Sequence, residues 1–314
     1  MPSAFCWFVA VVLTGALAPG AGTSMAANDT AQPRQRTVYV SATDKDGTPI
    51  TDLTAGEFEI KEGGRKTEIV SVKLSSTPLR IALIDADAGT GAFQLSVLRF
   101  MQKLVGHAEF SLTSVLIQAE KVMDYTADVD DLRAGINRIG IRGRERNNPQ
   151  LIEAIEEVTK DVAREARRPA IVVMRIGGEA ASVVAGTDVK EALRKTGAVL
   201  YVVSTLSATT RPASLVQGDD IVSVARGQLA DDEVTSSALN LAVVLGDGAK
   251  ESGGRHETVV STTLVTVMEQ IADELLNQYQ IDYALPADVK PSDKLSVSVK
   301  RKGVTLHAPS RIPN

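Results

Sequence analysis

The sequence predicts an α/β protein whose doubly wound, mostly parallel sheet is accompanied by a small flanking β domain. From Leu79 onward, apolar strand-like runs alternate with amphipathic segments of helical length, as expected of a doubly wound sheet. Before residue 78 and after residue 278, short segments instead alternate apolar and polar residues between glycine-containing turns, which is typical of antiparallel strands. The change from alternating strands to strand–helix alternation, and back again, predicts an α/β domain flanked by β segments.

The central strands are predicted where the chain is apolar on both faces. Ala170–Met174 and Ala198–Val203 are continuous apolar runs, as parallel strands covered by helices on both sides must be. Residues 110–118 and 120–126 have almost no linker between them, so we expect a hairpin that adds one antiparallel edge strand. The predicted strands are 79–85, 110–118, 120–126, 169–176 and 198–206, the predicted helices are 92–105, 128–139, 149–167, 188–196, 239–244 and 262–278, and residues 207–235 are expected to form a loop with some helix.

The flanking β domain is predicted from two separated pieces of the chain. Strands are expected at 38–43, 58–62 and 67–74 in the first piece, and at 295–300 and 304–306 in the second. Because the first piece is too short to bury a core of its own, we expect the two pieces to complete one another across an inserted α/β domain. The predicted divisions are 1–27 (signal peptide), 28–36 (linker), 37–77 (N-terminal β segment), 78–278 (α/β domain) and 279–314 (C-terminal β segment).

The composition excludes some classes of function. The chain has 314 residues, of which 23 % are charged and 44 % hydrophobic, a balance typical of globular proteins, and its formal net charge is −5. No run of lysines and arginines is long enough to follow a phosphate backbone, so nucleic acid is not expected as a partner. The densest basic cluster, Arg142, Arg144 and Arg146, is assigned to a solvated loop.

The N-terminal residues have the pattern of a secretory signal peptide. Ala4–Ala18 is apolar, uncharged and too short for a comfortable membrane span, and cleavage is expected after Ala26 or Ala27. No lysine or arginine precedes the apolar run, which leaves an uncleaved anchor or a misassigned start codon as alternatives. We expect a secreted or periplasmic protein whose mature chain has no stable membrane span. Cys6 is the only cysteine, so that mature chain would hold neither a disulfide nor a thiolate nucleophile.

The side chains best suited to bind a ligand lie where the first central strand ends. The run that begins at Leu79 leads directly into Asp85 and Asp87, and Gly89 and Gly91 follow in the turn before the next helix. Ligands of open α/β sheets bind just beyond the carboxyl ends of the strands. Carboxylates at that place offer oxygen ligands to a hard cation such as Mg²⁺.

Three parts of the chain carry a family resemblance: residues 40–54 with 58–60, then 81–85, and finally 253–255 with the helix through 271–272 and the run 276–283. Together they resemble the von Willebrand factor A (VWA)-related proteins of bacterial exported proteomes, over nearly all of the mature chain. The resemblance implies a three-layer, Rossmann-like A domain. It also implies a role in protein–protein interaction outside the cytoplasm, such as adhesion or scaffolding, with a protein partner that the sequence does not identify.

The same resemblance implies a magnesium site, which this sequence matches poorly. The family motif is Asp-x-Ser-x-Ser, with a threonine from a second loop and an aspartate from a third. Asp85 fits the first place, whereas Asp87 and Gly89 stand where the serines would be, and Thr90 is out of register by one residue. No threonine lies near Asn148, in the second loop. The third-loop aspartate would fall at Ile176, which supplies no oxygen.

We therefore expect a degenerate site and no cofactor. One alternative is that Asp85, Asp87, Thr90 and Asn148 still hold Mg²⁺ or another divalent ion weakly. In the metal-free case, Arg175 or Arg146 could pair with Asp85 or Asp87 and replace the charge of the cation.

An enzymatic alternative rests on the same two carboxylates. Phosphotransferases of the haloacid-dehalogenase type also place Asp-x-Asp after a first parallel strand, where one aspartate attacks phosphorus and the other transfers the proton. Asp85 and Asp87 fit that spacing. Gly218-Asp219-Asp220 could mimic the later acidic motif, but no apolar strand immediately precedes it.

Other catalytic patterns are not found in the sequence. His107, His256 and His307 have no metal-ligand or triad spacing, and neither a Gly-x-Ser-x-Gly elbow nor a phosphate-binding loop occurs. We expect a non-enzymatic protein whose binding face is formed by the loops 86–91, 141–149 and 175–187.

Overall fold

The computed structural model describes residues 34–87, 89–139, 150–163, 167–177, 182–205, 235–286 and 289–313. The predicted signal peptide (1–27), most of the predicted linker (28–36) and residues 207–234 of the predicted loop 207–235 lie outside these residues. None of the helices in the described ranges is both long enough and apolar enough to cross a membrane.

The central sheet runs β10-β9-β8-β5-β6-β7 within the described part of the chain, and only β7 is antiparallel to its neighbour. Counted along the chain from β5, this is the strand order 3-2-1-4-5-6 of the doubly wound fold. The β6–β7 pairing confirms the predicted hairpin. The strands are β5 (Leu79–Ala86), β6 (Ala108–Val115), β7 (Ala119–Thr126), β8 (Arg168–Ile176), β9 (Val199–Thr205) and β10 (His256–Val259).

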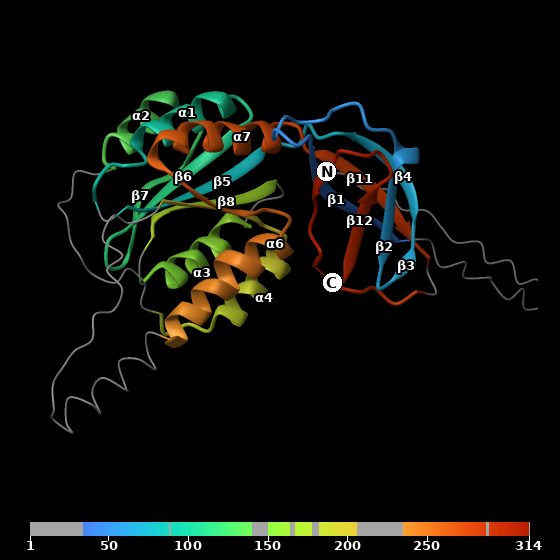
Figure 1. Ribbon diagram of the computed structural model, residues 1–314. Coiled ribbons are helices and arrows are strands. Elements are labelled where there is room, and N and C mark those ends of the chain that lie inside the picture. Colours follow the sequence, from blue (N-terminus) through green and yellow to red (C-terminus); the bar gives the residue numbers. More distant parts are fainter. Residues whose placement is uncertain are drawn as a thin grey trace, which may run out of the picture. The chain divides into compact units, whose positions relative to one another are not determined.

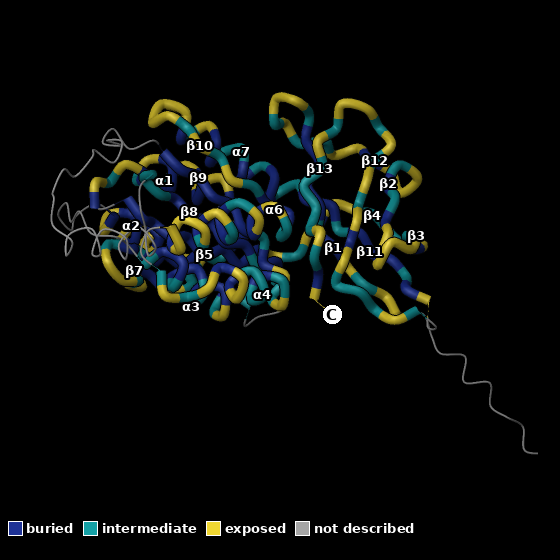
Figure 2. Tube along the Cα trace, turned by 60° about the horizontal axis from the view of Figure 1, so that its bottom comes forward, coloured by how far each residue is buried: buried dark blue, intermediate teal, exposed yellow. Residues whose placement is uncertain are grey.

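Helices cover both faces of the central sheet, which confirms the predicted three-layer α/β architecture (Figure 1). One face carries α1 (Gln94–Leu104), α2 (Val129–Ile136) and α7 (Leu264–Leu276); the other carries α3 (Leu151–Val162), α4 (Gly186–Thr196), η2 (Ala242–Gly248) and α6 (Ala249–Glu251). Successive residues of β5 divide between the two cores, because alternate side chains of a strand point to opposite faces: Ile81 and Leu83 face the α1 side, while Ala82 and Ile84 face the α3 side. Figure 2 shows that the buried residues are concentrated in the strands of this sheet.

Three elements differ from their sequence-based predictions. The final helix was expected to lead into residues 279–283 with no strand there, but α7 ends at Leu276 and Tyr279–Leu285 form strand β11. Strand β10 was not predicted, because four residues that alternate between partly buried and exposed positions carry too little apolar surface to be distinguished from a loop. Residues 239–244 were predicted to be an ordinary helix, but a π-helical segment begins at Ala242 and extends to Gly248.

The flanking β domain is built from both pieces of the chain. Strand β11, from the C-terminal piece, lies between β1 and β4 from the N-terminal piece, and β12 pairs with β2. The described strands form two sheets, β13-β1-β11-β4 and β12-β2-β3. Their bounds are β1 (Arg34–Thr43), β2 (Phe58–Glu62), β3 (Arg65–Lys66), β4 (Glu68–Leu74), β11 (Tyr279–Leu285), β12 (Leu295–Val299) and β13 (Thr305–His307), and the short helices η1 (Ala55–Glu57) and η3 (Ser261–Thr263) precede β2 and α7.

Side chains reinforce the pairing around β11. The carboxylate of Asp282 accepts hydrogen bonds from Thr37 of β1 (2.6 Å) and Ser71 of β4 (2.7 Å). The Glu62 carboxylate of β2 accepts from Tyr283 of β11 (2.7 Å) and is paired with Arg36 of β1 (2.8 Å), so it links the two sheets.

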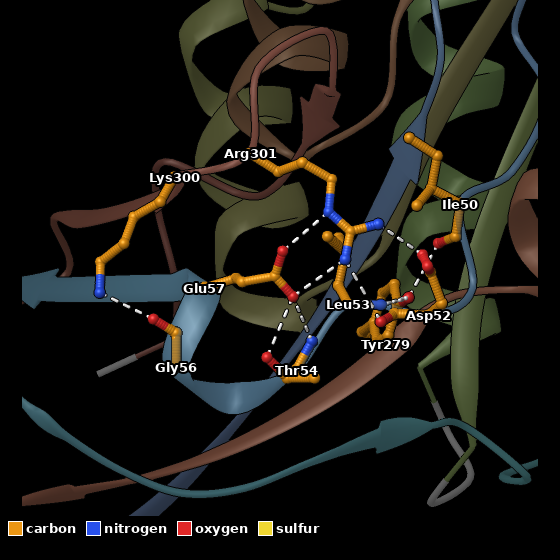
Figure 3. A network of polar contacts seen from close by, with 9 residues as sticks. All are labelled: Ile50, Asp52, Leu53, Thr54, Gly56, Glu57, Tyr279, Lys300 and Arg301. Atoms are coloured by element: carbon orange, nitrogen blue, oxygen red, sulfur yellow. Dashed lines mark hydrogen bonds and ion pairs between the residues drawn. The ribbon is translucent and has the colours of Figure 1, made fainter.

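A polar network joins the two pieces at the surface (Figure 3). Arg301, from the C-terminal piece, lies within 2.7 Å of the Glu57 carboxylate and 2.6 Å of the Asp52 carboxylate, both from the N-terminal piece. The hydroxyl of Tyr279 donates to the Ile50 carbonyl oxygen and accepts from the Leu53 N–H, each at 2.9 Å. The hydrogen bonds from Arg301 and then from the Thr54 backbone lower the pKa of Glu57 to about 2.

We predict that Arg301→Gln weakens this link in a pH-dependent way. Because the pKa of Glu57 is lower in the folded state, the ion pair stabilises the fold above about pH 4.3, the usual pKa of glutamate, and this stabilisation is lost as the pH falls toward 2. Since the pair is partly exposed to solvent, the variant should lower the melting temperature at pH 6 only slightly, on the order of 1 °C, and reduce the difference between pH 6 and pH 3.

Thermal unfolding followed by circular dichroism measures both quantities. Arg133→Gln is the matched control, because Arg133 pairs with Asp130 inside helix α2 and joins no separate pieces of the chain. An unchanged acid dependence in Arg301→Gln would contradict the prediction.

Candidate functional site

The carboxyl end of β5 lies at the point where the sheet changes direction. The chain proceeds from β5 to its neighbour β6 on one side, while β8 pairs with β5 on the other side. Such a switch point forms the ligand crevice of open α/β sheets. Asp85 occupies it, in register with Ser114 of β6 and Met174 of β8, and Asp87 follows two residues later.

The Asp87 side chain is hydrogen-bonded within the loop that follows it. Its side chain is buried, and its carboxylate accepts hydrogen bonds from the backbone N–H groups of Gly89 (2.8 Å) and Ala92 (2.9 Å) and from the Thr90 hydroxyl (3.1 Å). Gly89 and Gly91 have φ values of +71° and +73°, a conformation that favours glycine. Asp87 and Thr90 therefore fix the turn into α1.

Asp85, in contrast, has no hydrogen-bond donor beside it. It is 1 % exposed, and neither carboxylate oxygen contacts a donor in the described part of the chain. Burial, followed by the negative charge of Asp87, raises the pKa of Asp85 well above its usual value. The site therefore favours the protonated form of this carboxyl.

A divalent cation does not fit the described residues. Mg²⁺ requires near-octahedral oxygen coordination, but only Asp85, Asp87 and Thr90 of the predicted ligands lie here, and two of these are bonded to one another. No group of three or more His, Cys, Asp or Glu side chains in the described ranges could hold a metal. Ile176 packs against the apolar core on the α1 side, and the predicted ligand Asn148 lies outside the described residues.

The suggested pairing of Arg175 with Asp85 is wrong. Arg175 is in register with Ala86, and Asp85 is in register with Met174. Because neighbouring strand residues point to opposite faces, Arg175 lies on the α3 side of the sheet and Asp85 on the α1 side. The other suggested partner, Arg146, lies outside the described residues.

Arg175 instead belongs to a polar group that sequence reasoning missed. It is in register with Ser204 of β9, whose hydroxyl lies 2.8 Å from Nε2 of His256 in β10. Partial burial and then the Arg175 charge lower the pKa of His256. No carboxylate bonds to this histidine within the described ranges, so the group lacks the third member of a hydrolase triad. The period-two alternation of β8 and β9 could have placed Arg175 beside Ser204, but β10 was not predicted.

Apolar side chains are exposed around the first turn of α3, at the same edge of the sheet. Ile117 follows β6 and is 41 % exposed, and its carbonyl oxygen accepts from the Gln150 N–H (2.8 Å). Val183 follows β8 and is 90 % exposed, and its N–H donates to the Glu153 carboxylate (2.7 Å). Both contacts lie at the start of α3, so these two apolar side chains flank the same turn. The predicted loop 141–149 lies outside the described residues.

Solved structures that resemble this chain include VWA domains. A von Willebrand factor type A structure from Catenulispora acidiphila is 9 % identical, with 91 % of this chain and 75 % of that chain covered and a TM-score of 0.44. The conserved hypothetical protein BatB from Bacteroides thetaiotaomicron is 13 % identical, with 63 % and 98 % covered and a TM-score of 0.40. The SpRpn10 VWA domain is 12 % identical, with 62 % and 95 % covered and a TM-score of 0.40. No protein-family model and no curated protein sequence matches the chain. Similarity this low carries no information about function, which we infer from the geometry of the site.

We predict that Asp85→Asn stabilises the protein above neutral pH. Because the pKa of Asp85 is raised in the folded state, the folded protein keeps a proton that the unfolded chain has lost, so stability falls as the pH rises above about 4. Asparagine has no charge to bury, and the free energy of unfolding should increase by about 1–3 kcal/mol at pH 8 and by less at pH 5.

Urea denaturation at the two pH values measures this difference. Asp130→Asn is the control, because Asp130 lies on the exposed surface of α2. If Asp85→Asn destabilised the protein equally at both pH values, the ionised carboxylate would have a stabilising partner.

Proposed function

We propose that this chain is a protein–protein interaction module of VWA-like fold, exported from the cytoplasm, that recognises its partner without a divalent cation. One observation carries the proposal. At the carboxyl edge of the sheet, apolar side chains are exposed, whereas the carboxylates that would bind a metal are buried or bonded to their own loop.

The surface around α3 has the composition of a small interaction face. Ile117 and Val183 offer apolar contact, and the nearby backbone offers polar groups at its margin. Protein interfaces combine an apolar centre with a polar rim in this way. Both apolar residues follow strands whose carboxyl ends meet at this edge, so contact with a partner requires no rearrangement of the core.

Export is supported by the apolar segment Ala4–Ala18 and the small residues that follow it.

Burial of the two aspartates favours recognition over phosphoryl transfer. A nucleophilic carboxylate must reach phosphorus, and Asp85 is 1 % exposed. A general acid must be free to exchange its proton with the substrate, but both Asp87 oxygens accept hydrogen bonds from the loop.

We predict that the protein binds neither Mg²⁺ nor Mn²⁺ with millimolar or tighter affinity in isothermal titration, because the described residues supply too few oxygen ligands. Hydrolysis of p-nitrophenyl phosphate in the presence of Mg²⁺ should be at background in the same preparation. Asp85→Ala tests metal binding and Asp85→Asn tests hydrolysis. Binding or hydrolysis that the wild type shows and the corresponding variant lacks would overturn the metal-free, non-enzymatic proposal.

We also predict that Ile117→Asp and Val183→Asp, combined in one variant, abolish capture of the partner. A buried carboxylate at an interface is strongly unfavourable, and the expected loss of affinity is at least about tenfold. The measurement is a crosslinking pull-down from extracytoplasmic extract of the producing organism, with captured proteins quantified by mass spectrometry.

Val70→Asp is the matched control, because Val70 is a 56 % exposed valine on β4, away from the central sheet. Partners lost from the double variant but retained by wild type and control support the proposed face. Equal capture by all three proteins places the interface elsewhere.

A further inference from the structure

A cavity of about 250 Å³ lies at the amino ends of β8 and β9, at the opposite edge of the central sheet from Asp85. Strand β1, helix α4 and the segment before the C-terminus complete its wall. Its volume is slightly below the roughly 300 Å³ at which sites for drug-sized ligands begin. Of the described lining residues, Glu251 is the only acid, and the five cations are Arg167, Arg168, Lys190, Arg194 and Arg311.

Arg168 brings a positive charge to this wall without a counter-ion. It is 5 % exposed, and its hydrogen bonds go to neutral oxygens: Nε donates to the Thr77 carbonyl (2.7 Å), and Nη1 donates to the Leu275 carbonyl and the Gln278 side chain (both 3.0 Å). Among the described residues, no carboxylate pairs with Arg168, and its Nη2 atom makes no hydrogen bond. Burial lowers the pKa of Arg168 to about 10.

The other guanidinium groups take their carboxylates from outside the cavity. Arg194 is paired with Glu191 and donates to the Ile312 carbonyl oxygen (3.3 Å), and Arg311 is paired with Asp293. Neither Glu191 nor Asp293 lines the cavity. Arg167 is likewise paired with Glu109 (3.0 Å), and Lys190 is paired with Glu251 (2.9 Å). Among the described lining residues, Arg168 is therefore the cation without a carboxylate partner.

Apolar groups complete the lining. Val38 of β1, Leu79 of β5, Leu193 of α4 and Ile312 are buried side chains that border the cavity. A ligand that fits this lining has one acidic group and a compact apolar body, because a fully polar anion would leave the apolar wall without contact.

We propose that this cavity binds a small organic anion, whose acidic group lies against Arg168 and Arg194 and whose apolar body packs on Val38, Leu79 and Ile312. The attraction is strongest at Arg168, because a buried cation without a counter-ion gains most from an anionic partner. The proposal is independent of the recognition face around α3, which lies at the other edge of the sheet.

Fluorine NMR tests the proposal with three probes that differ mainly in charge: 4-fluorobenzoate, 4-fluorobenzyl alcohol and 4-fluorobenzylamine. We expect 4-fluorobenzoate to bind at least about tenfold more tightly than the neutral alcohol, and the cationic amine not to bind. A fourth probe, 4-fluorophenyl phosphate, shows whether a carboxylate or a phosphate is preferred.

The variant Arg194→Gln should weaken binding of the preferred anion at least about tenfold, with Arg133→Gln on α2 as the control of equal charge change. Arg168→Lys should also weaken binding of the preferred anion. If circular dichroism shows that this variant does not fold, Arg194→Gln alone tests the proposal. Equal binding of the benzoate, the alcohol and the amine would overturn the proposal. So would no binding of either anion up to about 10 mM, or anion binding unchanged in Arg194→Gln.

Discussion

Strand β11 needs partners on both sides, and both come from the other end of the chain. Its backbone pairs with β1 over residues 279–285 and with β4 over most of the same length, so it becomes an inner strand only when the N-terminal piece is in place. Ile281 is fully buried between Val38 and Val72 of those neighbours. The flanking domain has no core without this pairing, because the buried residues of its core come from both pieces.

Helix α7 connects the central sheet to β11, the strand whose two partner strands come from the other end of the chain. This helix ends at Leu276, two residues separate it from β11, and it packs on the face of the sheet that carries α1. Arg168 bonds to the Leu275 carbonyl oxygen and the Gln278 side chain, so it binds the end of α7 to the start of β8. A positive charge at the C-terminal end of a helix is favourable, which gives Arg168 a structural role beside its place at the cavity.

The sequence predicted the fold better than the chemistry of its sites. Long apolar runs such as Ala170–Met174 identify inner strands because both faces must be buried, and the hairpin at β6 and β7 follows from the short linker. The position of Asp85 and Asp87 at the end of β5 was predicted for the same reason. Strand β10 was missed because an edge strand of four residues has almost no hydrophobic pattern.

The partners of the charged side chains could not be predicted in this way. That Asp85 meets no hydrogen-bond donor depends on which face each residue of β8 takes. The partners of Arg168 are Thr77, Leu275 and Gln278, which come from distant parts of the chain. Both groups sit on the adjacent strands β5 and β8, an acid at one end and a base at the other, and each lacks an opposite charge among the described residues.

Because the chain is synthesised from its N-terminus, strands β1 and β4 are made long before their partner strand β11. Thr37 and Asp282 are bonded although 245 residues separate them, so the edges of the early strands stay open until the last part of the chain has been made. Open strand edges promote aggregation, and contacts this distant slow folding. If the intervening α/β domain folds first, it brings Leu79 and Gln278 to the wall of one cavity and shortens the remaining search. Folding of the inserted domain would then set the pace at which the flanking domain closes.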